Sequence, residues 1–290
     1  MNRAIWEQAF RDAVWLLMGC ALMMFGFHWL LVYLTSFIST SSFVEFMSDL
    51  PDQTHGMFGL SIGEAASWRG RIGLGYVDPT VVVISAVWAI ARGSDAVSGP
   101  LDRGTMEMIL AQPVSRIGVL VAHSGVTCLG AAAIGGAAWL GTWTGIATVS
   151  VEQSAWFGLV KSTVPLHTLL DSRDYIPSAI NLFCLTLFAA ALTALVSACG
   201  RYRWRTIGLV GGFYLVQIMI KVAGLMASHL DWLFYLTFLG AYWPQRLAVA
   251  APEDVARLSL QYNGVLLGGA VAGYLLAAVI FSRRDLPAPL

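Results

Sequence analysis

The chain has 290 residues, of which 57% are hydrophobic and only 12% are charged. This is about half the charged share of a typical soluble domain, which excludes an ordinary soluble protein and indicates one that lies largely within a membrane. The formal net charge is zero, so the overall charge gives no reason to expect a nucleic-acid partner.

Residues 2–12 precede the first long apolar stretch and carry an amphipathic pattern. One helical face would be apolar, with the side chains Ile5, Trp6, Ala9 and Phe10. We therefore expect a lead-in helix at the membrane surface, with a frayed and solvated tail as the alternative. The apolar stretch that follows is longer than the hydrophobic part of a signal peptide, and acidic residues precede it, so a cleaved leader is not expected.

A helix needs about 20 apolar residues to cross a bilayer core, and the uncharged stretches predict six such helices. Their expected positions are about residues 14–35, 73–92, 117–147, 177–199, 206–228 and 262–282. The second is the weakest prediction because Asp78 lies near one of its ends. The third stretch is longer than a span requires, so we expect its last third to be tilted, kinked near Gly135 and Gly136, or interfacial. The predicted fold is a single all-α polytopic membrane domain over residues 1–290.

The block between the second and third predicted spans, Asp95–Arg116, groups charged and helix-forming residues and reads DAVSGPLDRGTMEMILAQPVSR. Gly99 and Pro100 are expected to interrupt a helix that enters the block, and Gly104 to break it again. Thr105 would then cap a new helix.

The second half of this block predicts a short amphipathic helix at the membrane surface. Glu107 would lie in its first turn, where a carboxylate suits the positive end of the helix dipole. An apolar face would be formed by Met106, Ile109 and Leu110. Pro113 would end the segment, and Ser115 and Arg116 lead into the third span. An ordinary loop between helices is the alternative.

Lysine and arginine in short loops favour the cytoplasmic side of a membrane. If both termini are cytoplasmic, ten arginines fall in inner segments: Arg3, Arg11, Arg92, Arg103, Arg116, Arg201, Arg203, Arg205, Arg283 and Arg284. Only six basic residues then fall in the longer outer segments: Arg69, Arg71, Lys161, Arg173, Arg246 and Arg257. We therefore expect both termini and the loop at 92–116 to face the cytoplasm, in the cell (inner) membrane.

Two further patterns concern the outer side and the packing of the helices. Trp232–Gln245 is aromatic-rich, uncharged and too short to span, which predicts a re-entrant or interfacial helix pair before the last span. We expect Lys221 to extend to the outer surface. Glycines with G-x-x-x-G spacing would let helices approach closely in a bundle or dimer, although glycine is common in membrane helices. The pairs are Gly141/Gly145, Gly208/Gly212, Gly264/Gly268 and Gly269/Gly273.

Polar side chains at membrane depth are candidates to contact a substrate, although hydroxyls can instead bond their own helix backbone. They are His28, Ser85, His123, Thr127, Asn181, Thr186, Thr193 and Gln217. The sequence contains no phosphate-binding loop and no zinc or hydrolase motif, and the four cysteines lack metal-type spacing, so we expect no catalysis, metal or cofactor. His123 and Ser124 would point about 100° apart on a helix, which disfavours a catalytic pair.

The stretch Gly93–Gly99 (GSDAVSG), followed by Asp102–Arg116, resembles the cytoplasmic loop of ABC-2-type transporter permeases. Loops of that family carry an acidic–basic cluster, a Gly-Thr pair and a Glu-Leu-Leu-like run that ends in Pro-x-Ser-Arg. The lead-in helix, the six spans and the aromatic segment also agree, so the resemblance covers nearly the whole chain, although only the loop has a specific motif. Within the family, the chain looks most like the branch with the permease for nitrous-oxide-reductase maturation.

The resemblance implies a permease subunit of an exporter, with a coupling helix around Thr105–Ala111 that docks on a separate ATP-binding-cassette ATPase. It also implies a second permease copy, identical or related, within the membrane lipid. The coupling-loop residues carried over are Asp102, Arg103, Gly104, Thr105, Glu107, Pro113, Ser115 and Arg116. Of these, Glu107 and Arg103 would meet the ATPase, Gly104 and Thr105 would set the turn, and the last three would start the third span.

The chain departs from the family pattern at Pro100 and Leu101, where relatives usually carry glutamate and arginine. We expect a kinked approach to the loop and a weaker or different ATPase contact. Two other classes stay open. An intramembrane enzyme would need paired catalytic groups that face one cavity, and a structural membrane anchor would tolerate charge reversal at Glu107 and Arg103. The sequence does not indicate the transported substrate.

Overall fold

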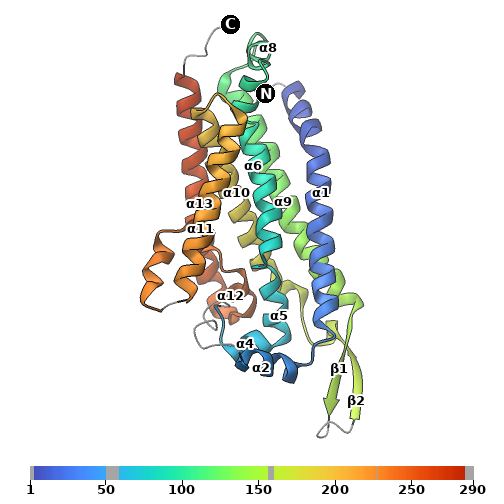
Figure 1. Ribbon diagram of the computed structural model, residues 1–290. Coiled ribbons are helices and arrows are strands. Elements are labelled where there is room, and N and C mark those ends of the chain that lie inside the picture. The colour runs from blue at the N-terminus through green and yellow to red at the C-terminus, as the bar shows by residue number, and fades with distance from the viewer. Residues whose placement is uncertain (1–2, 50–58, 156–159, 227, 285–290) are drawn as a thin grey trace.

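The computed structural model describes residues 3–49, 59–155, 160–226 and 228–284. Within these ranges, six helical segments are long and apolar enough to cross a membrane, and they form one elongated bundle (Figure 1). The prediction of an all-α polytopic fold is confirmed. The spans are α1 (Arg3–Thr35), the pair α5 and α6 (Trp68–Gly75 and Pro79–Ser94), α9 (Arg116–Thr148), α10 (Ile176–Cys199), α11 (Arg203–Met226) and α13 (Pro252–Arg283).

The two ends of the bundle carry different short elements (Figure 1). One end, here named the loop end, holds both chain termini and the short helices α7 (Ser98–Asp102) and α8 (Met106–Leu110). The other, named the hairpin end, holds α2 (Thr40–Asp49), α4 (Ile62–Ala66) and the antiparallel strands β1 (Ser150–Ala155) and β2 (Val160–Pro165). The termini therefore lie on the same side as the loop between the second and third spans.

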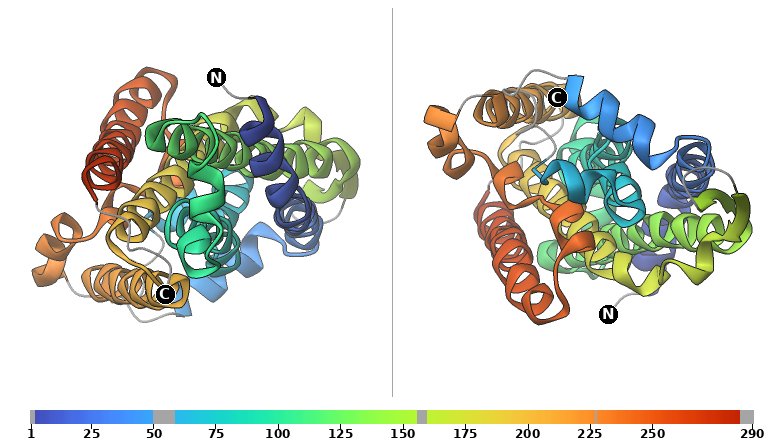
Figure 2. Two further views of the ribbon diagram at one scale, coloured as in Figure 1. Left: turned by 90° about the horizontal axis from the view of Figure 1, so that it is seen from above. Right: turned by 90° about the horizontal axis from the view of Figure 1, so that it is seen from below.

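The helix α10 is the centre of the bundle. Seen along the bundle, it lies between α6, α9, α11 and α13 (Figure 2). The helix α1 packs against α9 at the edge of the bundle that is remote from α11 and α13. Contact between α9 and α1 depends on two glycines, because a Cβ at Gly141 would collide with the Phe25 carbonyl and one at Gly145 with Val32. The close packing predicted for this glycine pair is therefore present within a single chain.

The expected lead-in helix is not a separate element. Residues from Arg3 onward are the first turns of α1, which continues into the span without a break. Ile5 and Ala9 are buried as the pattern predicted, but Phe10 is 52% exposed. The separation fails because no glycine or proline lies between the amphipathic turns and the apolar stretch, so nothing interrupts the helix.

The second span is broken at residues 76–78. Asp78 ends the break by capping α6, since its carboxylate accepts a 2.8 Å hydrogen bond from the Thr80 N–H. Pro79 follows as the first helical residue, where its missing N–H costs nothing. Asp78, whose charge made this span the weakest of the six predictions, is therefore the N-cap of α6, the longer helix of the pair.

The third span runs as one helix through Gly135 and Gly136, so the helix is not interrupted at these glycines, one of the three alternatives expected for this stretch. Gly135 instead lets α9 approach α10 closely, because a Cβ there would lie 2.9 Å from the Ala179 carbonyl oxygen. The helix ends at Thr148, and the chain enters the β1–β2 hairpin, in which Ser150 pairs with Pro165. No sequence pattern indicated this hairpin, since β1 begins inside the long uncharged stretch.

The segment before the last span folds back against the bundle as short helical turns: η4 (Ser228–Tyr235), η5 (Phe238–Ala241) and α12 (Pro244–Val249). Asn181 of α10 holds it in place. Its side-chain amide donates to the Ala241 carbonyl (3.2 Å) and to Asn263 of α13 (2.8 Å), and its oxygen accepts from the Trp243 N–H (3.1 Å). The segment is thus helical, as expected, but its first turns are 3₁₀ helix.

The other glycine pairs divide into two groups. Gly269 and Gly273 face Phe188 and Ala191 of α10 within the chain. At the other two pairs, no described atom lies within 4 Å of the position that a Cβ would take. These pairs are Gly208 and Gly212 on α11, and Gly264 and Gly268 on α13. Two of the four pairs therefore leave open faces on the outside of the bundle.

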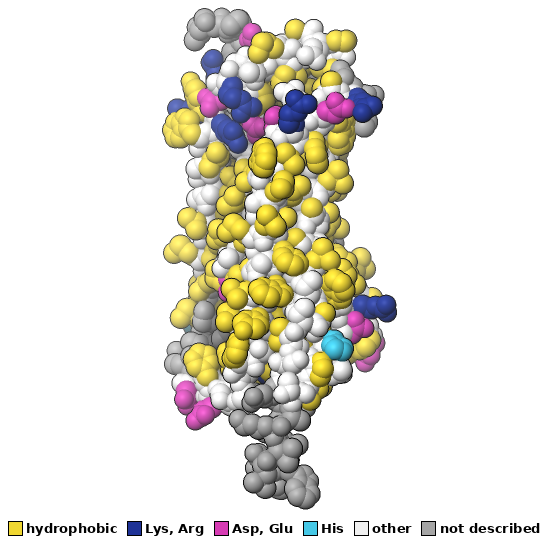
Figure 3. Space-filling view, turned by 90° about the vertical axis from the view of Figure 1, so that its right-hand side faces the viewer, with side chains coloured by type: hydrophobic (Ala, Val, Ile, Leu, Met, Phe, Trp, Pro, Cys, Tyr) yellow, Lys and Arg dark blue, Asp and Glu magenta, His cyan; other side chains and the backbone are white. Residues whose placement is uncertain are grey.

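Side chains of different type separate along the length of the molecule (Figure 3). In this view, a tall band of hydrophobic side chains lies below a row of Lys, Arg, Asp and Glu near the loop end, and other charges lie toward the hairpin end. Exposed apolar side chains on the spans include Leu22, Leu129, Leu209 and Leu275. A belt of this kind suits lipid contact, since water would penalise so much exposed apolar area.

Candidate functional site

The loop between α6 and α9 follows a course different from that expected at its start. The helix α6 ends at Ser94, with Asp95 as its C-cap, before Gly99 and Pro100 are reached. Both of these residues lie inside α7, where Pro100 is the third helical residue. Proline is tolerated there because the first N–H groups of a helix have no intrahelical acceptor. The expectation that these two residues interrupt the incoming helix is therefore wrong.

Gly104 makes the turn between α7 and α8 with a φ of +69°, a left-handed conformation that favours glycine. The expected capping by Thr105 is wrong. Its own backbone is helical (φ −88°, ψ −12°), which points the side chain away from the α8 N–H groups, and its hydroxyl donates to the Pro100 carbonyl at 3.3 Å. Thr105 thus ties α8 back to α7.

The helix α8 has one buried and one exposed face, as its pattern predicted. Met106 is 1% exposed, and Ile109 and Leu110 pack against the core formed by α1 and α9. Glu107 is exposed, and Met108 is 66% exposed. A free carboxylate beside a large bare thioether at the loop end forms a surface suited to a protein contact.

Asp95 is the centre of a cluster of charges below this loop. It is 6% exposed, and its carboxylate lies 2.8 Å from Arg103 of the loop, 3.6 Å from Arg203 of α11 and 3.9 Å from Arg92 of α6. Gly99 makes room for it, since a Cβ at Gly99 would collide with the carboxylate. One buried carboxylate thus joins the loop to two spans.

A hydroxyl on the central helix fixes the start of α7. The Ser197 oxygen accepts hydrogen bonds from the N–H groups of Val97 (3.3 Å) and Ser98 (2.8 Å), and it donates to the Ser94 carbonyl (3.1 Å). The Ser98 hydroxyl also lies 3.2 Å from that of Thr206 on α11. The loop is therefore hydrogen-bonded to α10 and α11, and the Asp95–Arg203 pair also joins it to α11 by charge.

The far end of the loop is attached to the last span. Ser115 caps α9, since its hydroxyl accepts from the Gly118 N–H at 3.0 Å. Arg116 donates to the carbonyls of Phe281 and Arg284 at the end of α13. Arg284 in turn donates to the Ala198 and Gly200 carbonyls at the end of α10 (2.8 and 2.9 Å). Guanidinium groups at helix C-termini suit both the free carbonyls and the helix dipole.

Most residues that the resemblance assigned to the loop are thus brought together at the loop end. Asp102, Gly104, Glu107, Pro113 and Ser115 are exposed, and Arg103 is half exposed while it also pairs with Asp95. Sequence reasoning missed Ser197 and the role of Asp95. It counted Arg203 only as an orientation signal. No sequence pattern marks Ser197, because its function depends on a loop that lies about a hundred residues earlier and meets it only in the fold.

A polar cavity of about 630 Å³ lies between this loop, α1 and α6. Its charged lining consists of Asp12, Arg92, Asp95, Arg103 and Arg203. The charge cluster around Asp95 therefore borders a hollow beneath the loop, next to α1.

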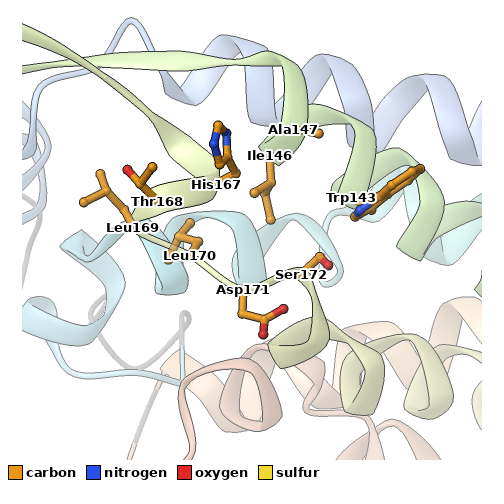
Figure 4. A pocket seen from close by; sticks show the side chains of 9 residues that line it. All are labelled: Trp143, Ile146, Ala147, His167, Thr168, Leu169, Leu170, Asp171 and Ser172. Atoms are coloured by element: carbon orange, nitrogen blue, oxygen red, sulfur yellow. The ribbon is translucent and has the colours of Figure 1, made fainter.

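A second hollow, of about 390 Å³, lies at the hairpin end between α9 and the turn that follows β2 (Figure 4). Figure 4 shows the imidazole of His167 and the carboxylate of Asp171 pointing away from one another. Across the described residues, no group of three or more His, Cys, Asp or Glu is placed to hold a metal ion. This hollow therefore offers no converging ligands.

The polar groups at membrane depth serve mainly to satisfy the helix backbone. The hydroxyls of Ser85, Thr127, Thr186 and Thr193 each donate to the carbonyl four residues earlier. His28 is bonded to the Met24 carbonyl at 2.9 Å. His123 and Ser124 make no hydrogen bond with each other in the described structure, and each retains an unpartnered polar atom. The geometry gives no catalytic pair at that position.

Comparison with known families identifies the chain. The sequence model of the family described as "ABC-2 family transporter protein" matches residues 4–286, nearly the whole chain. The protein is therefore a multi-pass membrane permease component of the ABC transporter class, and it belongs to the ABC-2 family. Comparison with curated proteins found none that matches this chain.

Proposed function

We propose that this protein is the membrane-spanning subunit of an ATP-driven exporter and that the loop at 95–116 receives the mechanical work of a separate ATPase subunit. The exposed face of α8, with Glu107 and Met108, would be the contact for that ATPase. The resemblance implied that Arg103 contacts the ATPase. We propose instead that Arg103 stabilises the loop through its ion pair with Asp95.

The observation that carries the proposal is the attachment of the loop to three spans. Asp95 and Ser197 join it to α6, α10 and α11 through short polar contacts. A displacement of α8 would be transmitted to these helices, because breaking the ion pairs and hydrogen bonds that join them to the loop costs free energy. Coupling of two conformations through such a contact is what a transport cycle requires.

The distribution of basic residues supports a cytoplasmic loop. Ten arginines belong to segments at the loop end, against six basic residues in the longer segments at the hairpin end. The positive-inside rule then places the loop and both termini in the cytoplasm, in the plasma membrane of the cell. This is also the side on which ATP is available to a partner.

A second permease copy would complete the transport path. The open glycine faces on α11 and α13 support this part of the proposal, since small residues allow close helix contact in lipid. The substrate stays unassigned, because the polar side chains at membrane depth mainly bond their own helices.

The test is co-purification from native membranes with ATP and vanadate, which traps assembled ABC transporters. We expect the full-length chain to retain an ABC-type ATPase, identified by mass spectrometry, and the Glu107→Lys and Met108→Glu variants to lose it. Glu45→Lys is the matched control, because Glu45 is an exposed carboxylate on α2 at the hairpin end. Each variant is first checked for unchanged thermal unfolding.

Three results would contradict the proposal. Failure of the unaltered chain to retain any nucleotide-binding subunit would remove its basis. Full retention by both loop variants would show that α8 is not the contact for the ATPase. Retention lost only with Glu45→Lys would place the contact at the hairpin end and reverse the orientation.

A further inference from the structure

A laterally open apolar groove lies at the hairpin end, remote from the coupling loop. It encloses about 680 Å³ between α1, α2, the α5–α6 pair and α11, within the range of about 300–1,000 Å³ usual for ligand sites. Figure 1 shows α6 between α1 and α11, with α2 crossing near their ends. Val83 and Phe46, 56% and 60% exposed, line the groove and belong to the lipid-facing surface.

Lys221 lies in this groove, contrary to the expectation that it extends to the outer surface. It is 7% exposed, and its contacts are with Tyr242 and Trp243, the link between η5 and α12. Its ammonium donates one hydrogen bond, to the Tyr242 carbonyl at 2.7 Å, and it lies 4.7 Å from the centre of the Trp243 ring. An ammonium has three donors, so two have no hydrogen-bond acceptor among the described residues.

Arg71 supplies a second buried cation to the same groove. It is 3% exposed, donates to the Ile38 carbonyl (2.7 Å) and the Thr40 hydroxyl (2.9 Å), and stacks on Trp68 at 3.9 Å. Its Nε atom is buried without a hydrogen-bond partner. Neither Arg71 nor Lys221 has a carboxylate within ion-pair distance among the described residues.

Asp78 is the one carboxylate that lines the groove in the described structure. It is engaged as the cap of α6 through the Thr80 N–H. Two cations against one carboxylate leave a net charge of plus one in an apolar setting. A buried charge normally has a partner because its desolvation is costly. None of the described residues provides that partner, so the groove, as far as it is described, lacks one negative charge.

We propose that the groove binds an anionic phospholipid of the leaflet at the hairpin end. The phosphate would accept from Lys221 and Arg71, and an acyl chain would lie along the apolar wall formed by Leu31, Val82, Val222 and Leu225. A lipid fits better than a soluble anion, because most of the lining is apolar and the mouth opens among lipid-facing side chains. The lipid would bridge α1, α6 and α11 and steady their packing.

The test uses the full-length protein in nanodiscs of phosphatidylcholine, with or without phosphatidylglycerol, and native mass spectrometry of retained lipid. We expect one tightly retained phosphatidylglycerol per chain and a higher Tm in its presence. Lys221→Met should weaken retention by about tenfold or more, as expected when one partner of a desolvated charge pair is removed. It should also abolish the rise in Tm that depends on phosphatidylglycerol.

Two variants serve as controls. Arg246→Gln removes a cation that stacks on the same Trp243 ring at 4.1 Å but lies outside the groove, and it should retain the lipid. Val83→Trp fills the mouth of the groove while both cations remain, and it should lose the lipid. The difference between the two lipid compositions separates lipid binding from a purely structural role of Lys221, which would lower Tm equally in both.

Several outcomes would overturn the proposal. They are no selective retention by the unaltered protein, equal retention by Lys221→Met, equal retention by Val83→Trp, or equal loss with Arg246→Gln. A rise in Tm with sn-glycerol 3-phosphate alone that matches the effect of the lipid would show a soluble-anion site instead. None of these measurements depends on an ATPase partner, so they are independent of the proposed transport function.

Discussion

Arg103 of the loop and Asp95 at the end of α6 form a 2.8 Å ion pair in which the carboxylate is buried and the guanidinium is half exposed. The pair closes the loop onto the span from which it leaves. Its geometry explains how a loop with five-residue helices can be stiff: its folding depends on a buried charge in the bundle and not on its own helical hydrogen bonds.

Replacement of Asp95 should therefore uncouple the loop. Asp95→Asn keeps the shape but leaves three guanidinium groups without a carboxylate. We expect a loss of about 3 kcal/mol in unfolding free energy, at the low end for broken buried pairs because Arg103 is partly solvated. Unfolding in mixed micelles measures it. The control is Asp102→Asn, at an exposed carboxylate of the loop, which should change the unfolding free energy by less than about 0.5 kcal/mol. If Asp95→Asn and Asp102→Asn lower the unfolding free energy equally, the burial of Asp95 does not matter.

Asn181 should control the segment at 228–249. Asn181→Leu removes three hydrogen bonds and leaves the Trp243 N–H without its acceptor, at an expected cost of about 3 kcal/mol. Limited proteolysis should then cleave after Arg246, a bond that the helix α12 is expected to protect in the unaltered protein. Asn263→Leu, which leaves the two backbone contacts of Asn181 in place, should cost less, and the double variant less than the sum. Additive effects would contradict a shared network.

The open glycine face on α11 should lie in the contact between two copies. Gly208→Leu combined with Gly212→Leu should reduce dimer recovery after cross-linking in membranes by about tenfold, since close helix contact needs small residues. Gly136→Leu is the control, because Gly136 also has no atom within 4 Å of a built Cβ but lies on α9. If the control variant alone loses the dimer, the contact lies on α9.

The helix α4 should depend on pH. Hydrogen bonds from the Ser61 hydroxyl and then from the Ser61 backbone N–H lower the pKa of Glu64 below its ordinary value of 4.5. A carboxyl group with a lowered pKa in the folded state stabilises the fold above its unfolded pKa, and this contribution is lost as the pH falls through the folded pKa. Hydrogen-exchange protection of residues 62–66 should therefore fall below pH 4.5, and Glu64→Gln should remove that dependence.

Much of this protein follows from the sequence alone. Uncharged stretches long enough to cross a bilayer fix the six spans, because an unpaired backbone group or charge in lipid is too costly for any other arrangement. The motif at Asp102–Arg116 also marks the loop, and the amphipathic pattern of Met106–Leu110 predicts which face is buried. These are local properties, which spacing along one helix determines.

The tertiary structure decided what depends on distant neighbours. The expectation that Lys221 snorkels was overturned by Tyr242, which the fold brings to it from the segment before the last span. Capping by Thr105, in contrast, failed for a local reason, the helical backbone of Thr105 itself. The meeting of Asp95 with Arg203, and of Ser98 with Ser197, likewise has no sequence signal. Burial sets the energy of a polar group, and burial is decided by which helices pack together, so these contacts emerge only once the bundle is assembled.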